Sequence, residues 1–303
     1  MAFPSSPDNG EQYTIDNVTW EYISSKGAWE LIDYQNLTGV TVEIYTSSNT
    51  WTKPANADVV TAICIGAGGG GDTAYYATIG YPTYDYYFGA GSGGGGGAMS
   101  CYTYDASDLG STVTVEVGSG GIGGTGYNSI YAYGLTGGTS YFGSGVKAGG
   151  GGGAYHSAYA YPGSGGKGMF PGGDGGTSAS TVDSGTGMSN QPGGDGGDSY
   201  GGAGGGGGGT IYYGSGFSGS VGGDGGSALS HSVPVNYASP TFMAVPASGG
   251  VGQTLNSTTN SGPSVGNTYG GGGGGGANNG NSYFYYGVDG ASGIVIVVTW
   301  YSA

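Results

Sequence analysis

Glycine constrains this chain more than any other residue, because 78 of its 303 residues are glycine and many of them form unbroken tracts. Glycine loses the most conformational entropy on folding, so such a composition is ordinarily that of a disordered chain. Disordered chains are also poor in aromatic residues, whereas this one has 28 Tyr, 7 Phe and 4 Trp. We therefore expect the glycine tracts to be packed. The tracts are Gly68–Gly71, Gly93–Gly97, Gly149–Gly153, Gly204–Gly209 and Gly270–Gly276.

Strand patterns lie on both sides of the glycine-rich middle. Val40–Tyr45 and Thr112–Val117 alternate apolar and polar residues, as half-buried strands do, whereas Val59–Ile65 and Gly293–Trp300 are more continuously apolar. No segment has apolar residues at helical spacing, so we predict almost no α-helix. The predicted fold class is all-β, an antiparallel β-sandwich with strands within about 40–65, 98–117 and 293–300.

The middle of the chain, about residues 118–290, fits neither ordinary strands nor helices. A polyproline II helix has three residues per turn, rises about 3.1 Å per residue and makes no internal hydrogen bonds. When its residues are glycine, several such helices can pack closely enough to exchange backbone hydrogen bonds. We therefore predict a bundle of polyglycine II helices that is clamped by the sandwich.

The first 36 residues read as a separate small β module. Strands are predicted at Gln12–Ile15, Thr19–Ile23 and Trp29–Asp33, with turns between them. Three strands barely suffice for independent stability, so this module is expected to lean on a neighbour. We predict two domains, an attachment or assembly module at 1–36 and a glycine-rich domain at 37–303.

The charge balance limits the possible partners. The chain has no Arg, only four Lys and a net charge of −15, so it lacks the cationic surface that nucleic acids require. A neutral glycan or a protein receptor fits this charge better than an anionic surface. The N-terminus carries no signal-peptide pattern and no apolar run is long enough to span a membrane, so neither secretion by that route nor membrane insertion is expected. Cys64 and Cys101 are expected to be free thiols, although a disulfide between them is conceivable.

Motifs for catalysis, metals and cofactors are weak. Gly118–Gly123 matches a dinucleotide fingerprint, but no helical pattern follows it. Asp174, Asp195 and Asp224 each lie in a Gly-Gly-Asp-Gly-Gly repeat, and the spacing of these repeats does not fit a calcium β-helix. We expect these Asp side chains to occupy equivalent turn or rod-surface positions and to accept hydrogen bonds from local backbone amides. His156 and His231 lie in no catalytic or metal motif, so no enzyme activity, cofactor or metal is predicted, although a glycosidase-like pair among the Asp residues remains open.

Tyrosine clusters flank the glycine tracts, where a rod would end and a loop would turn. Tyr with Ser, Gly and Asn is the composition of antibody paratopes, and Tyr also stacks on sugar rings. About half of these rings are expected instead to shield the bundle, and Thr73–Phe88 is the best candidate for an exposed recognition loop. The predicted receptor-binding residues are Tyr75, Tyr76, Tyr81, Tyr84, Tyr86, Tyr87, Phe88, Tyr155, Tyr159, Tyr161, Tyr212, Tyr213, Tyr283 and Tyr285.

The order of motifs resembles a known family. Trp51–Ala55, Val59–Gly71, Thr112–Gly121, Gly137–Gly143 and Gly290–Val297 look like the glycine-rich domain of bacteriophage tail-fibre and tail-tip proteins. The segment Phe3–Gly10, with Tyr13 and Trp20, resembles a short module of phage structural proteins. A related glycine-rich domain occurs in an animal receptor ectodomain, but the signal peptide and cysteine pattern expected there are missing.

The resemblance implies a non-enzymatic virion adhesin, synthesised in the host cytoplasm, in which Tyr-rich loops contact a host receptor. Residues 1–36 would then dock on other tail proteins, and a homotrimer is possible. The alternative is a purely architectural virion or filament protein whose tyrosines make contacts between subunits. A depolymerase is a third, weaker hypothesis.

Overall fold

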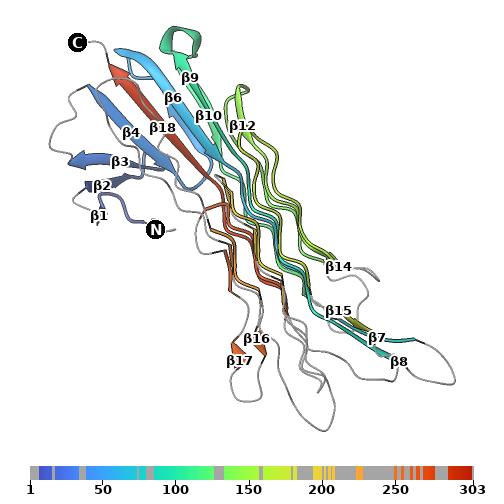
Figure 1. The fold of residues 1–303 in the computed structure, drawn as a ribbon. Helices are drawn as coiled ribbons and strands as arrows, with labels where there is room; N and C mark the ends of the chain where they lie inside the picture. The colour runs from blue at the N-terminus through green and yellow to red at the C-terminus, as the bar shows by residue number, and fades with distance from the viewer. Residues whose placement is uncertain are drawn as a thin grey trace.

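The structure is a computed structural model of the chain. It describes residues 7–15, 18–33, 39–73, 75–79, 85–125, 133–156, 160–178, 180–182, 194–199, 201–202, 204–205, 207–208, 223–227, 249–250, 254–255, 260–261, 264–266, 269–276 and 286–301. Strands gather at one end of an elongated molecule, and glycine-rich rods extend from them toward the other end (Figure 1). The described residues contain one single-turn 3₁₀ helix, η1 (Ala106–Asp108), and no helix able to cross a membrane.

A seven-stranded antiparallel sheet, here called the large sheet, forms one layer. Its order is β1 (Gln12–Ile15), β2 (Val18–Ile23), β3 (Ala28–Asp33), β4 (Val40–Tyr45), β18 (Ile294–Tyr301), β6 (Ala57–Ile65) and β9 (Met99–Asp105). The C-terminal strand β18 lies between β4 and β6, so the two ends of the glycine-rich region pair directly, as predicted.

A four-stranded antiparallel sheet, the small sheet, forms the other layer. Its order is β12 (Val146–Ala148), β11 (Ser140–Phe142), β10 (Thr112–Glu116) and β5 (Asn49–Thr52). The sandwich and the all-β class are therefore confirmed.

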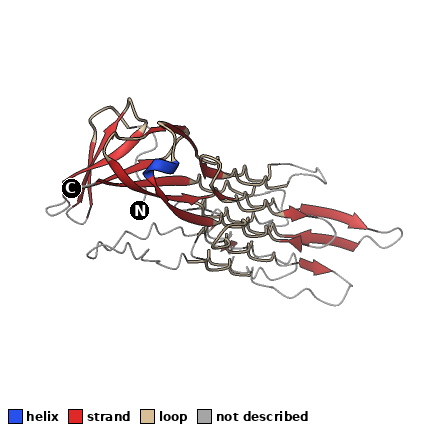
Figure 2. Ribbon diagram, turned by 90° about the horizontal axis from the view of Figure 1, so that it is seen from above, coloured by secondary structure: helices blue, strands red, loops and turns tan. Residues whose placement is uncertain are grey.

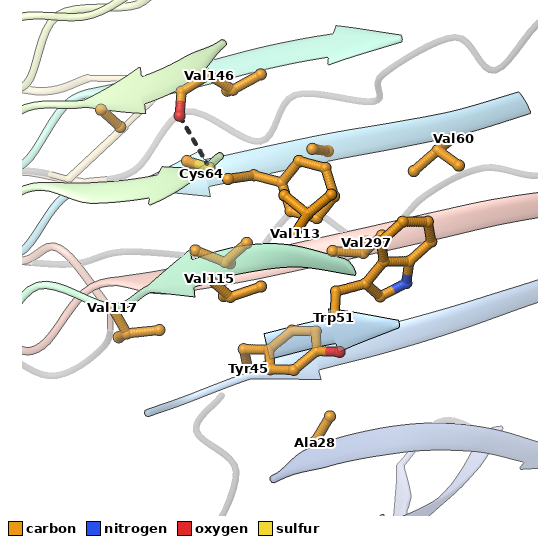
Figure 3. Close-up of a cluster of buried hydrophobic side chains, with 14 of the residues drawn as sticks. Ala28, Tyr45, Trp51, Val60, Cys64, Val113, Val115, Val117, Val146 and Val297 are labelled. Atoms are coloured by element: carbon orange, nitrogen blue, oxygen red, sulfur yellow. Dashed lines mark hydrogen bonds between the residues drawn. The ribbon is translucent and has the colours of Figure 1, made fainter. Parts of the chain in front are cut away.

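Alternating side chains of the two sheets fill the core between them. Val60, Cys64 and Val297 of the large sheet face Trp51 and Val115 of the small sheet, and all five are almost completely buried (Figure 3). The Trp51 and Phe142 rings meet edge to face, with 5.5 Å between their centroids. Each buried aromatic ring removes a large apolar area from water.

The N-terminal strands continue the large sheet. β3 pairs with β4 at Trp29 and Ile44, and the Trp20 and Trp29 rings are buried with Ile44, Ile63 and Ile296 on the sheet face that points away from the small sheet. The module therefore leans on the sandwich, and the boundary drawn at residue 36 stays a prediction.

Two central rods, residues 66–73 and 90–98, show the threefold hydrogen-bond period expected of polyglycine II helices. In the first rod, Gly66, Gly69 and Asp72 donate amide hydrogen bonds to the second rod. Every third amide along the rod thus bonds to the same neighbouring segment. Three residues per turn give this period. The first rod donates to 92–98, 135–138 and 288–291, and it accepts from 121–124, 151–154 and 273–276. The second donates to 270–276, 173–176 and 149–152, and it accepts from 66–72, 163–166 and 202–208. Both rods thus satisfy their backbone groups through six surrounding segments.

Close packing explains why the rods are glycine. A Cβ atom on Gly94 would lie 2.1 Å from the Gly69 carbonyl oxygen, and one on Gly69 would lie 2.0 Å from the Gly152 oxygen. Real Cβ contacts are never this short, so a side chain at these positions would push the rods apart.

Short sheets extend beyond the rods at the end opposite the sandwich (Figure 2). β7 (Tyr75–Ile79), β8 (Asp85–Gly89) and β15 (Ser180–Val182) form one; β13 (Tyr155–His156) pairs with β14 (Ala160–Tyr161), and β16 (Thr254–Leu255) with β17 (Asn260–Ser261). The predicted loop Thr73–Phe88 thus contains two paired strands, because its Tyr-, Thr- and Phe-rich segments have high β-propensity.

Candidate recognition surface

Three tyrosine rings meet at the end of the rods that is remote from the sandwich. Tyr133 stacks on Tyr155 with ring centroids 4.3 Å apart and planes inclined at 30°. Tyr161 lies on the next strand, its ring centroid 6.1 Å from that of Tyr155. Tyr155 and Tyr161 remain 44% and 51% exposed. We call Tyr133, Tyr155 and Tyr161 the tyrosine cluster.

The rods determine this arrangement. The Gly134 amide donates to the Ala154 carbonyl at 3.0 Å, so the residues that precede one rod and follow the other, Tyr133 and Tyr155, are placed side by side. The β13–β14 pairing then places Tyr161 directly across from Tyr155. The Ala154 amide bonds Gly70 of the first central rod, which ties the cluster to the middle of the bundle.

Aliphatic side chains continue this surface along the flank of the bundle. Ile122 and Leu135 are 56% and 55% exposed, and the Leu135 amide donates to the Ile122 carbonyl at 2.8 Å. Tyr286 is exposed at the start of the adjoining rod, which bonds through Gly287 to Gly124. Exposed apolar residues that adjoin one another in this way are typical of interaction surfaces.

The predicted site residues fall into three groups. The structure brings Tyr155 and Tyr161 together. It places Tyr75, Tyr76, Tyr86, Tyr87 and Phe88 on the β7–β8 hairpin, where only the backbone is described. Tyr81, Tyr84, Tyr159, Tyr212, Tyr213, Tyr283 and Tyr285 lie outside the described residues.

Two rings that belong to the tyrosine cluster or adjoin the flank of the bundle were missing from the predicted set, Tyr133 and Tyr286. Each lies immediately before a glycine that begins a rod, Gly134 and Gly287. That position is the signal that could have identified both, because it places a residue at the rim of the bundle.

Acidic side chains take part in joining the outer rods. The Asp174 carboxylate accepts from the Gly165 amide at 2.7 Å, and the Asp195 carboxylate accepts from the Asp224 amide at 2.9 Å. Asp198 and Asp289 accept from Ser227 and Gly123 in the same way. Carboxylates here replace the carbonyl oxygen of a neighbouring rod. Asp174 and Asp195 thus accept backbone hydrogen bonds as expected, but the donors belong to other rods and are not the local amides that were predicted.

Asp72 differs from these acids of the outer rods, because it lies buried at the end of the first central rod. Burial raises its pKa to about 8, although a hydrogen bond from the Thr73 amide opposes this. The group is therefore largely protonated near neutral pH.

The described part of the chain contains possible metal ligands and two thiols. No group of three or more His, Cys, Asp or Glu side chains there is arranged to hold a metal ion. Cys64 and Cys101 are free thiols, as expected. They project from opposite faces of the large sheet. Cys64 points into the core between the sheets, and Cys101 packs against the apolar residues around Trp20 and Trp29 on the other face.

A comparison with protein families matches residues 43–300 to a glycine-rich domain. The chain belongs to this glycine-rich domain family. The match spans β4 to β18, and so includes the small sheet, both central rods and the tyrosine cluster. No curated protein matches the chain.

Proposed function

We propose that this glycine-rich domain protein is an adhesin of a virus particle, at the tail fibre or tail tip of a bacteriophage, which binds the host surface through its Tyr-rich end. The observation that carries the proposal is the tyrosine cluster, which is partly exposed and is held at the end opposite the sandwich by rods that bond to the first central rod. Such a rigid aromatic surface binds with little loss of conformational entropy.

The net charge of −15 supports a neutral glycan or a protein as the receptor, rather than an anionic polymer. In this proposal the β7–β8 hairpin contributes further tyrosines, and residues 1–36 attach the protein to other tail components. The protein acts without an enzymatic step.

The test is binding of fluorescently labelled protein to a panel of bacterial cells, measured by flow cytometry. We expect saturable binding to a subset of strains, and a loss of about tenfold or more in the variant that combines Tyr155→Ala and Tyr161→Ala. Tyr141→Ala is the matched control, because this ring lies in the small sheet beside Lys147 and far from the cluster. Equal binding by the double variant and the wild type would contradict the proposal.

An architectural virion or filament protein is the second candidate. The exposed Ile122 and Leu135 favour it, because they lie on the flank of the bundle where a neighbouring subunit would pack. In this case the labelled protein binds none of the cells, whereas Leu135→Asp prevents incorporation into particles.

A further inference from the structure

The outer edge of β9 has backbone groups that face away from the large sheet. Met99 and Phe170 exchange two hydrogen bonds of 2.8 and 2.9 Å on the side of Met99 that points away from β6. The direction of hydrogen bonding alternates along an antiparallel strand. Cys101, Thr103 and Asp105 therefore also direct their N–H and C=O groups outward.

The edge is open beyond its first two residues. Phe170 covers Met99, and the Met169 amide donates to the Ser100 hydroxyl at 3.0 Å. Past this point no described residue bonds the backbone on the outer side of Cys101–Asp105, and β9 is the last strand of its sheet. An open edge of this kind is a template for another strand.

Other edges in the described sandwich are shorter or protected. β5 has four residues and is followed by Lys53 and Pro54, while β12 has three and carries Lys147. β9 has seven residues, contains neither Lys nor Pro, and pairs with β6 without a bulge. Lys, Pro and bulges are the usual protection against edge pairing, and β9 lacks all three.

We propose that β9 is a dimerisation edge, at which β9 of a second copy of this chain pairs antiparallel about Thr103. This register sets Thr103 against Thr103 of the other copy and Cys101 against its Asp105, so every outward-facing residue meets another. Tyr102, 57% exposed and edge to face with Tyr104 at 4.7 Å, then lies beside Tyr104 of the second copy. Aromatic pairs across strands stabilise such ladders.

The charge on the edge is compatible with self-pairing. Asp105 is the one charged residue of β9, and its carboxylate is engaged by the Ser107 amide and hydroxyl. The remaining repulsion between two acidic copies is long-range, so salt screens it. Dimerisation is therefore expected to strengthen as salt is added.

The test is sedimentation equilibrium of the full chain over a concentration series, with Thr103→Pro as the variant. Proline removes an N–H that faces outward, which an edge strand tolerates, and the symmetric dimer loses two donors. We expect dimerisation to weaken by about tenfold or more. Thr52→Pro is the matched control, because Thr52 is an exposed Thr on an edge strand of the small sheet. The Thr52→Pro variant should dimerise as the wild type does.

A cross-link provides an independent measurement of the register. Residues in a hydrogen-bonded antiparallel pair have Cα atoms about 5.5 Å apart, which a disulfide can bridge. Thr103→Cys should therefore form an oxidised dimer on a non-reducing gel, whereas Thr52→Cys should not. A chain that stays monomeric at every concentration, a Thr103→Pro variant that dimerises normally, or equal cross-linking of the two Cys variants would each overturn the proposal.

Discussion

The carbonyl oxygens of the rods determine which residues the bundle tolerates. Gly94 is an example, since its Cβ position lies 2.1 Å from the Gly69 oxygen. We expect Gly94→Ala to lower the free energy of unfolding by about 3 kcal/mol or more, because a methyl group there must displace a hydrogen-bonded backbone. Urea unfolding measures this change. Gly110→Ala is the control, since its Cβ would have 3.4 Å to the nearest atom and should change the stability little.

Asp72 gives the fold an unusual dependence on pH. Its pKa is about 8 in the folded chain, against 3.8 for the free group. The folded state therefore retains a proton that the unfolded state releases, and this stabilisation is complete below about pH 4 and is lost as the pH rises through 8. We expect Asp72→Asn to flatten the fall in the free energy of unfolding between these limits. Asp108→Asn, an exposed acid in η1, should leave the slope unchanged, and an unchanged slope in Asp72→Asn as well would contradict the assignment.

The N-terminal strands are held to the sandwich by one lysine as well as by their pairing. Lys26 contacts Glu30 on β3 and Glu43 on β4, two carboxylates that lie opposite each other in the sheet. Burial lowers the pKa of Lys26, but its hydrogen bond to Glu30 and the charge of Glu43 outweigh this and raise the pKa overall. The lysine thus offsets a repulsion across the β3–β4 junction.

Removal of this charge should loosen the junction. We expect Lys26→Met to destabilise the docking of β1–β3 by about 0.5–1 kcal/mol, a modest value because the side chain is half exposed. Amide hydrogen exchange in β2 and β3 should accelerate, while exchange in β6 and β18 stays as it was. Lys167→Met is the control, and equal exchange in both variants would argue against this role.

The sequence predicted individual strands better than it predicted which segments lie side by side in the fold. Apolar alternation identified β4 and β10, and short β-branched apolar runs identified β6 and β18, because both patterns are typical of strands. The order of the rods could not be read, because all glycine tracts have the same chemistry. The pairing of Tyr133 with Tyr155 depends on which rods are adjacent, so only the structure brings those rings together. The β7–β8 hairpin was missed although its β-propensity was visible in the sequence.

The molecule contains two kinds of regular backbone hydrogen bonding, that of the β-sheets and that of the glycine rods. The central rods contain no strand, yet their amides are buried and bonded as those of β6 and β18 are. We expect amides of residues 66–73 and 90–98 to exchange with deuterium as slowly as those of the large sheet. Mass spectrometry after exchange checks this, with the exposed residues 110–111 as the fast reference. Exchange within seconds in the rods would show that the bundle does not form.

The period of three along each rod acts on chain length much as a reading frame acts on a gene. An inserted residue inside a rod turns every later amide toward the wrong neighbour, whereas three inserted residues restore the phase. Between the rods no such phase exists, so a connecting segment can lengthen or shorten by any number. Variation in this family should therefore accumulate as free changes of length in the connections and as multiples of three in the glycine tracts.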